Sequence, residues 1–350
     1  MSVWSDLYNG RTHFDIVSRW KRWFTASGVA LVIAIISLAT FQLDLSIDFT
    51  GGTIITAENS TGKSVAVYRT ALVEVGQEGA KVQITGSNQV VVQTESLDSE
   101  DQDALVNVVA DTAGVTFTDT NVEAVGPTFG EEITRKALQA LVIFLLVIAG
   151  FISWRFHWKM ALAALAALTH DLIITTGLYA LIGFPVTPAT VIAILTILGY
   201  SLYDTVVVFD KIEENTVELH GRYTFTEIAN LSLNQVLMRS INTSFTSLLP
   251  IGSLLFVGSY LLGAATLREF ALALFIGVSI GTYSSIFIAT PLLALWKERE
   301  PEWQRTQRRR VRKAGDDDVA SVSAGVADAH AELRETGAVP RPPRKRKKRR

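Results

Sequence analysis

The sequence contains no cysteine, and only 19% of its 350 residues are charged. The missing cysteines exclude a disulfide-linked scaffold and a thiolate metal site. An average soluble domain has roughly 25% charged residues, and here the lower charge accompanies a mean hydropathy of +0.29. This composition excludes a disordered protein.

Charge is also divided unevenly along the chain. Residues 297–350 contain 17 Lys and Arg against 9 Asp and Glu, whereas residues 1–296 contain 15 against 25. Such asymmetry predicts a membrane or a nucleic acid as a partner.

Six apolar stretches dominate the sequence, and each approaches the length of about 20 residues that a helix needs to cross a bilayer core. They cover residues 24–43, 137–153, 160–184, 189–209, 244–264 and 270–296. The first is too long for a cleaved signal peptide, and no Ala-x-Ala site follows it. The sequence therefore predicts an α-helical membrane protein with six transmembrane helices.

Basic residues are concentrated in segments that lie on one side of the membrane if all six spans cross it. They precede the first span and lie in the second and fourth connections and in the tail, whereas residues 44–132 contain 15 acids and three bases. Because Lys and Arg accumulate in cytoplasmic loops, we expect residues 44–132 outside the cytoplasm. Residues 1–23 and 297–350 are then cytoplasmic.

Residues 44–132 are long enough to fold as a small domain. Their patterns predict strands at 53–57, 81–85, 90–93 and 120–125 and helices at 64–75 and 99–113. This β-α-β-β-α-β order predicts an α+β ferredoxin-like domain. The segment contains no histidine, and its acids are scattered, so we expect it to contact another protein.

Two acidic positions fall inside the predicted spans. Asp171 follows His170, and Asp204 follows Thr196 and Tyr200 at helical spacing. A charge at the centre of a membrane helix costs at least about 2.5–3.5 kcal/mol, so such residues need partners or a wet cavity. They are either a proton relay or a polar cluster that joins helices, and His170 and Asp171 could form a local pair.

The connection before the fifth span begins with a capping-box pattern, Thr224-x-x-Glu227. Mixed apolar and polar residues follow it, which predicts an interfacial helix on the cytoplasmic side near residues 224–240. Arg239 then precedes the fifth span, where it either reaches lipid phosphates or pairs with Asp204. Asn242 is a further polar residue at this entrance.

Small residues predict close helix packing at two places. Gly277 and Gly281 lie four residues apart on the sixth span, and Gly199 lies on the fourth. Glycines at such spacing let helices approach closely in a membrane.

Taken in order, several motifs resemble the SecF family, which is part of the resistance-nodulation-division superfamily. They are DFTGG at 48–52, VGPTFGEE at 125–132, HD at 170–171, GYSLYDTVVVFD at 199–210, RSINTS at 239–244 and GTYSS at 281–285. The family commonly has Asn before the motif Asp, where this chain has Tyr203. Any hydrogen bond from that neighbour to Asp204 is therefore in doubt.

The resemblance implies a translocase subunit in the bacterial plasma membrane. Such chains pair with SecD, associate with the SecYEG channel and use the proton-motive force to promote preprotein export, without a cofactor, a metal or a hydrolytic site. By the resemblance Asp204 and Arg239 are implicated in proton transport. We add Asp171 to them, with His170, Thr196, Tyr200 and Asn242 as supporting polar residues.

Two other functions stay open at this stage. A small-molecule exporter belongs to the same superfamily, although such pumps usually carry two repeats in one chain. An intramembrane aspartyl protease also uses two aspartates, although no Gly-x-Gly-Asp occurs in any span. The basic tail beyond residue 297 lies outside the resemblance, and we expect it to be disordered and to contact anionic lipid or the ribosome.

Overall fold

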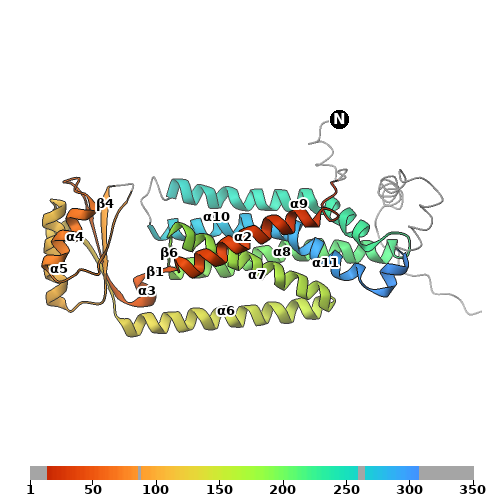
Figure 1. Ribbon diagram of the computed structural model, residues 1–350, viewed down its shortest axis with the longest axis horizontal. Helices are drawn as coiled ribbons and strands as arrows, with labels where there is room; N and C mark the ends of the chain where they lie inside the picture. Colours follow the sequence, from red (N-terminus) through yellow and green to blue (C-terminus); the bar gives the residue numbers. More distant parts are fainter. Residues whose placement is uncertain (1–13, 86–87, 259–264, 307–350) are drawn as a thin grey trace, which may run out of the picture.

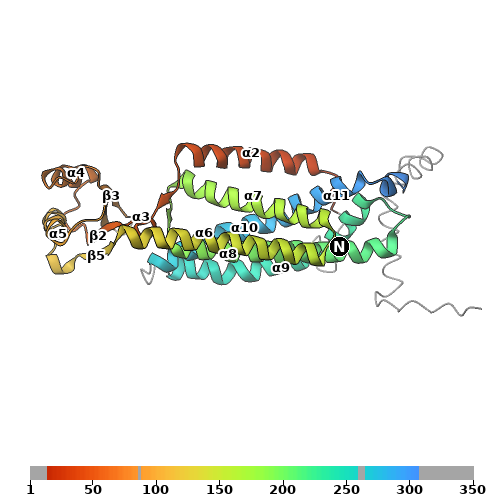
Figure 2. The same ribbon diagram turned by 90° about the horizontal axis from the view of Figure 1, so that it is seen from below.

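Residues 14–85, 88–258 and 265–306 are described by a computed structural model. A bundle of long helices carries a small α/β domain at one end (Figures 1 and 2). We call this end the domain end and the opposite one the tail end. Predictions for residues 1–13, for residues 259–264 of the fifth span and for tail residues 307–350 lie outside the described residues.

Within the described residues, six helical segments are long and apolar enough to cross a membrane. They are α2 (Trp20–Thr40), α6 (Pro127–Arg155), α7 (Trp158–Ile182), α8 (Pro188–Leu219), α9 (Phe225–Ser253) with π-helix η2 (Leu254–Gly258), and α10 (Ala265–Ser284) with π-helix η3 (Ser285–Ala289) and α11 (Thr290–Glu298). The predicted six-helix membrane fold is confirmed.

Helix ends differ from the limits of the apolar stretches. α6 begins at Pro127 rather than near residue 137, and α8 continues to Leu219 rather than ending near residue 209. Proline suits a first helical position because its missing N–H would have no partner there. A helix forms its own backbone hydrogen bonds and can therefore continue beyond the bilayer into water. Hydropathy identifies only the part of the helix that is apolar enough to lie in lipid.

The separate interfacial helix expected near residues 224–240 is wrong, because residues 225–253 form one continuous helix, α9. The predicted capping box is present at its start: Thr224 N donates to Glu227 Oε2 at 2.8 Å, and Glu227 N donates to Thr224 Oγ1 at 3.3 Å. No Gly or Pro follows until Pro250, so backbone hydrogen bonding continues the helix directly into its apolar part.

The domain is built on a four-stranded antiparallel sheet of order β3-β4-β2-β5. Its elements are β2 (Gly52–Glu58), α4 (Val65–Glu74), β3 (Lys81–Ile84), β4 (Gln89–Thr94), α5 (Ser99–Ala113), a short 3-10 turn (Phe117–Asp119) and β5 (Asn121–Val125). Both helices cover one face of the sheet (Figure 1), where Tyr68, Leu72 and Leu105 pack against Ile55 and Val92. The predicted ferredoxin-like β-α-β-β-α-β fold is confirmed.

Short elements join the domain to the bundle. β1 (Asp44–Leu45) pairs in parallel with β6 (Pro185–Val186), and α3 (Ile47–Thr50) contacts the start of α6. A Cβ atom at Gly51, whose φ is +72°, would lie 2.8 Å from Pro127 Cα, and one at Gly130 would lie 2.7 Å from the Phe49 carbonyl oxygen. Glycines therefore allow direct backbone contact between α3 and α6.

The segment before α2 is held by two asparagines of α9, which we call the asparagine clamp (Asn230 and Asn234). Asn230 Oδ1 accepts hydrogen bonds from Ile16 N at 2.9 Å and Val17 N at 3.1 Å. Asn234 Oδ1 accepts one from Phe14 N at 2.9 Å, and both side-chain amides donate to the Phe14 carbonyl. The amide side chains thus provide partners for backbone groups of residues 14, 16 and 17.

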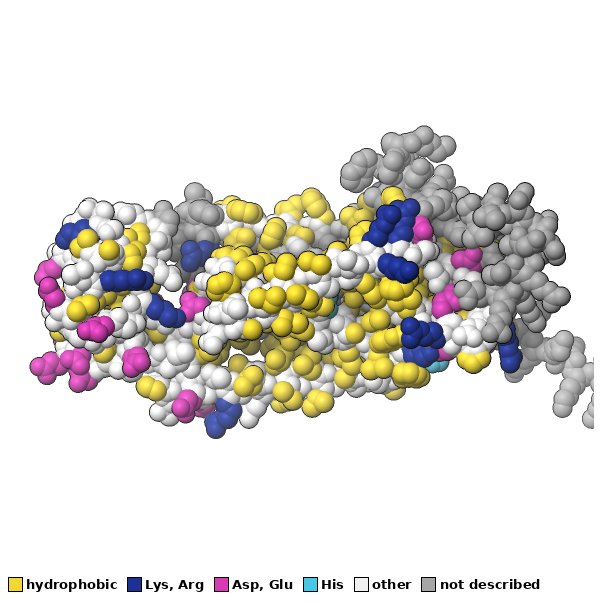
Figure 3. Space-filling view, viewed as in Figure 1, with side chains coloured by type: hydrophobic (Ala, Val, Ile, Leu, Met, Phe, Trp, Pro, Cys, Tyr) yellow, Lys and Arg dark blue, Asp and Glu magenta, His cyan; other side chains and the backbone are white. Residues whose placement is uncertain are grey.

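Side-chain types are distributed along the long axis. On the face in Figure 3, hydrophobic side chains cover most of the bundle, whereas charged side chains of both signs lie on the domain and near the tail end. This pattern is typical of a protein whose apolar middle part crosses a bilayer and whose two charged ends lie in water.

Candidate functional site

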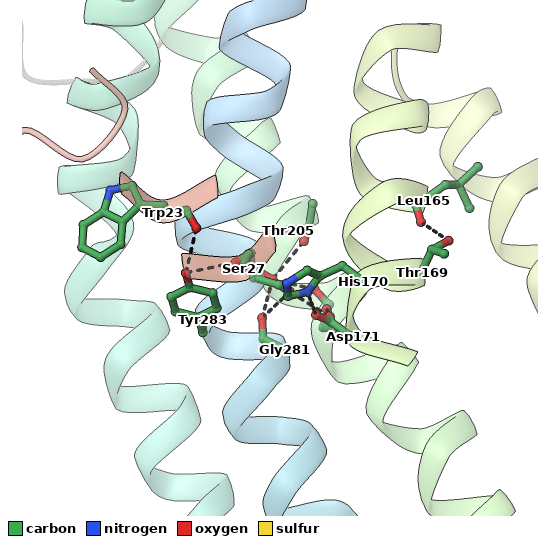
Figure 4. A network of polar contacts seen from close by, with 12 residues as sticks. Trp23, Ser27, Leu165, Thr169, His170, Asp171, Thr205, Gly281 and Tyr283 are labelled. Atoms are coloured by element: carbon green, nitrogen blue, oxygen red, sulfur yellow. Dashed lines mark hydrogen bonds and ion pairs between the residues drawn. The ribbon is translucent and has the colours of Figure 1, made fainter. Parts of the chain in front are cut away.

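Asp171 is the centre of a buried polar network between three helices, part of which Figure 4 shows. Its side chain on α7 has no solvent exposure. Oδ2 accepts hydrogen bonds from Ser201 Oγ on α8 at 2.6 Å and from Ser284 Oγ on α10 at 2.8 Å. Oδ1 lies 3.1 Å from His170 Nδ1. These partners account for a carboxyl group in the membrane interior.

His170 contributes one ring nitrogen to this network and leaves the other unused. Its side chain is 5% exposed, and Nε2 has no hydrogen-bond partner in the part of the chain that the structure describes. The expected local pair of His170 and Asp171 is present, and it is one part of a larger set of contacts.

The sixth span changes from α-helix to π-helix beside α7 and α8, where Ser284 contacts α7 and Ser285 contacts α8. π-helix η3 follows Ser284 directly, and Ser285 Oγ donates to the Ser201 carbonyl at 3.1 Å. Thr205 Oγ1 in turn donates to Ser285 Oγ at 3.0 Å. A Cβ atom at Gly281 would lie 2.9 Å from Ser201 Cβ. A π-turn shifts the side-chain register, and the missing side chain of Gly281 allows the close approach.

Asp204 lies one turn along α8 from Ser201, 8% exposed. It borders a small cavity of about 10 Å³ between α8, α9 and α10. The lining is mostly hydroxyl-bearing: Tyr200, Ser201, Tyr203, Thr243, Ser244, Ser247, Val278 and Thr282, with Asp204 itself. A cavity needs at least roughly 10–15 Å³ to hold one water molecule, so this cavity has room for at most a single water beside the carboxyl group.

Arg239 on α9 lies near Asp204 without pairing directly with it. Arg239 Nη2 donates a hydrogen bond to Tyr203 Oη at 2.9 Å, and among the described residues no ion pair of this arginine with Asp204 is present. Its charge still acts on Asp204 through space. Tyr203, the residue that departs from the family pattern, therefore contacts the arginine.

Three of the expected supporting residues lie on exposed faces. Thr196, Tyr200 and Asp204 follow one another at four-residue spacing on the continuous helix α8, and Thr196 donates to the Ile192 carbonyl of its own helix at 2.8 Å. Threonine hydroxyls often bond back to the preceding turn in this way. Tyr200 is exposed yet lines the cavity, and Asn242 is exposed near the start of the fifth span.

The glycines divide into two groups. Gly277 meets the Ile197 side chain of α8 so closely that a Cβ atom would collide, and Gly281 meets Ser201. Both therefore pack α10 against α8 of the same chain. Gly199 has no described atom within 4 Å of its Cβ position. No helix in the described part of this chain approaches it closely, and the predicted approach of a neighbouring helix at Gly199 stays a prediction.

Sequence reasoning missed Ser201 and Ser284 as carboxyl partners. Both belong to motifs that carry the family resemblance, at 199–210 and 281–285. A serine is common in membrane helices, and its spacing alone does not show which carboxyl group it meets. The pairing depends on the contact of α7, α8 and α10 in three dimensions.

Two family models match this chain. The model described as "Protein export membrane protein SecD/SecF, C-terminal" matches residues 105–299, and "SecD/SecF GG Motif" matches residues 36–58. SecF of Streptomyces coelicolor is 42% identical over 323 residues, which cover 92% of this chain and 87% of the relative. This chain belongs to the SecF family of protein translocase subunits.

Other members and solved structures agree with this family. SecF of Mycobacterium tuberculosis (strain CDC 1551) is 42% identical over 95% of this chain and 79% of the relative. The crystal structure of Thermus thermophilus SecDF, described as a translocon-associated membrane protein, matches with a TM-score of 0.75 and 35% identity. That match covers 83% of this chain and 39% of SecDF, so the SecF chain spans about two fifths of that structure.

The glycines that let α3 contact α6 and β2 contact β4 (Gly51, Gly52 and Gly130), which we call the glycine joint, overlap a family motif. The GG-motif match includes Gly51 and Gly52, and Gly52 has φ +136° with its Cβ position against the Thr94 carbonyl oxygen. Both glycines adopt backbone conformations that L side chains rarely take. The motif thus marks the point where the membrane part meets the α/β domain.

Proposed function

We propose that this SecF chain, with a SecD partner, uses the proton-motive force to promote preprotein export through the SecYEG channel. One observation carries the proposal: Asp204 lies inside the bundle beside a cavity for one water, while Arg239 is bound to Tyr203. A carboxyl group with a water and an unpaired cation nearby can change its charge and its partner together.

The exchange would work as a two-position switch. When Asp204 is neutral, Arg239 stays with the Tyr203 hydroxyl, and when Asp204 is ionised, the guanidinium is drawn toward it. Because Asp204 and Arg239 lie on α8 and α9, the two helices would shift. One proton moving through 100 mV releases about 2.3 kcal/mol, enough to bias a two-state equilibrium roughly fifty-fold.

Two connections support transmission to the domain. The asparagine clamp joins α9 to the segment before α2, and α2 leads through β1 into the domain. The glycine joint fixes α3 against α6. A shift of α9 would thus reach the domain through backbone contacts, and repeated shifts would draw a preprotein outward.

The same proposal includes orientation and further partners. The bacterial plasma membrane would hold the domain outside and both termini in the cytoplasm. The excess of Lys and Arg in residues 297–350 and of Asp and Glu in residues 44–132 supports this orientation. The domain would contact the preprotein or the channel, and the tail would contact anionic lipid or the ribosome. The energy source is the proton gradient, with no cofactor.

Protease chemistry is supported less well by this geometry. Aspartyl proteases place two carboxyl groups side by side so that they share one proton. Here Ser201 and Ser284 bind the Asp171 carboxyl, and Asp204 borders a separate cavity. The arrangement suits passage of a proton between groups better than attack on a peptide bond.

Proton-driven translocation in reconstituted vesicles that contain the SecD partner tests the proposal. Asp204→Asn should abolish the stimulation by a proton gradient, and Arg239→Lys should lose part of it because the forked geometry is lost. The matched control is Asp210→Asn on the same helix, where Asp210 forms a half-exposed ion pair with Arg155. Wild-type stimulation in Asp204→Asn would overturn the proposal.

A further inference from the structure

Asp171 and Asp204 lie on different helices and have different partners. One residue, Ser201, bonds to Asp171 and also lines the cavity beside Asp204. Ser201 Oγ donates to Asp171 Oδ2 at 2.6 Å, and Ser201 also lines the Asp204 cavity. Ser201 precedes Asp204 by three residues on α8, which places the two side chains on neighbouring positions of one helix face. We propose that the Ser201 hydroxyl is the link through which Asp204 and Asp171 exchange one proton, an inference that rests on the function proposed above.

The hydroxyl chemistry suits this task. A serine hydroxyl has one proton to donate and two lone pairs to accept. The short bond to Asp171 uses the proton, and the lone pairs stay available to a water molecule in the neighbouring cavity. Ser201 is buried, so bulk water does not compete for its hydroxyl group.

The transfer balances without any other reactant. Neutral Asp204 gives its proton to the cavity water, which passes one of its own protons to Ser201 Oγ. Ser201 releases its original proton to Asp171 Oδ2 at the same time. Asp204 becomes the carboxylate and Asp171 the neutral acid, and the same steps in reverse return the proton to Asp204 and restore the starting hydrogen bond.

The surrounding groups hold Ser201 in this position. Ser285 Oγ fixes its carbonyl oxygen, and Gly281 leaves room for α10 against its side chain. The charged and titratable neighbours differ at the two ends: His170 lies beside Asp171, and Arg239 acts on Asp204. When Asp171 is protonated, its carboxyl group therefore lies beside a histidine ring. When Asp204 is ionised, the nearby charge is that of Arg239.

Ser284 provides a matched comparison. It donates to the same Asp171 oxygen at 2.8 Å, yet it is not among the residues that line the Asp204 cavity. Ser284→Ala and Ser201→Ala each remove one donor to Asp171, but only Ser201→Ala removes the link. Thr205→Val removes another buried hydroxyl that contacts neither carboxyl group.

The experiment uses the full chain with its SecD partner in vesicles and measures proton flux and infrared carboxyl bands, assigned with Asp204→Asn and Asp171→Asn. In the wild type, protonation of one aspartate should shift the band of the other. Ser201→Ala should uncouple the bands and lower flux at least tenfold, whereas Ser284→Ala and Thr205→Val should keep the bands coupled.

Coupled bands in Ser201→Ala, or the same uncoupling in Ser201→Ala and Ser284→Ala, would overturn the link. The second result would mean that both serines only orient Asp171. If Asp204→Asn abolishes flux while Ser201→Ala retains it, the Ser201 link alone is wrong. If Asp204→Asn retains wild-type flux, the proton-driven function itself is wrong.

Discussion

The asparagine clamp offers a direct measure of how strongly the segment before α2 is held. Asn230→Ala removes three hydrogen bonds, two accepted from Ile16 N and Val17 N and one donated to the Phe14 carbonyl. The two amide N–H groups belong to buried residues, and their bonds have no obvious replacement. The Phe14 carbonyl keeps its bond from Asn234.

The expected free-energy cost of Asn230→Ala follows from the two backbone N–H donors that lose their hydrogen-bond acceptor. A buried donor without a partner costs roughly 1–3 kcal/mol, so the loss of partners for both donors should make opening of the segment easier by roughly 2–6 kcal/mol. A factor of ten corresponds to about 1.4 kcal/mol. The population of the open segment should therefore rise roughly 30-fold or more.

The absence of cysteine from the chain makes the assay selective. Val17→Cys introduces one thiol at a side chain that is 2% exposed, so its rate of maleimide labelling reports how often the segment opens. Asn230→Ala in this background should raise the rate roughly 30-fold. Asn242→Ala is the control, because it changes an exposed asparagine on the same helix. An increase below about threefold would show that the amide bonds do not hold the segment.

Two further changes test packing and charge. Gly277→Ala should destabilise the bundle by roughly 1–3 kcal/mol, because its Cβ would meet Ile197, whereas Gly199→Ala should be neutral in the same thermal unfolding assay in detergent. Burial disfavours the charged form of Glu300, but the hydrogen bonds and charges of Lys159 and Lys297 together outweigh it, so the pKa of Glu300 is lowered. The stabilisation is thus present above pH 4.5 and lost as pH falls through the native pKa. Glu300→Gln should lower stability at pH 7 by at most about 1 kcal/mol, and a difference from wild type that does not shrink as the pH falls below 4.5 would contradict this.

Local patterns predicted those features that depend on neighbours in sequence. The apolar stretches correspond to the membrane part of each helix, because lipid requires about 20 apolar residues whatever the helix contacts. The capping box at Thr224 and Glu227 acts over three residues, and the strand and helix order of the domain follows from alternation and helical spacing. These features need no information about distant residues.

Features that depend on distant contacts could not be read in the same way. The continuity of α9 was missed because its first half is polar, and those polar side chains are buried against residues far away in sequence, such as Phe14. Thr196 and Asp204 share a helical spacing, yet one hydroxyl bonds to its own backbone and the other side chain borders a cavity. Periodicity identifies a face and leaves open what that face meets.

By itself, the sequence determined that this chain crosses a membrane six times, carries a ferredoxin-like domain and places two carboxyl groups within the spans. Hydropathy, charge placement and residue spacing suffice for these properties, since each arises within one segment. Only the tertiary structure decided that Ser201 lies between Asp171 and the Asp204 cavity and that Arg239 is held by Tyr203. Those relations come from the contact of separate helices, where a shift of one ångström makes or breaks a hydrogen bond.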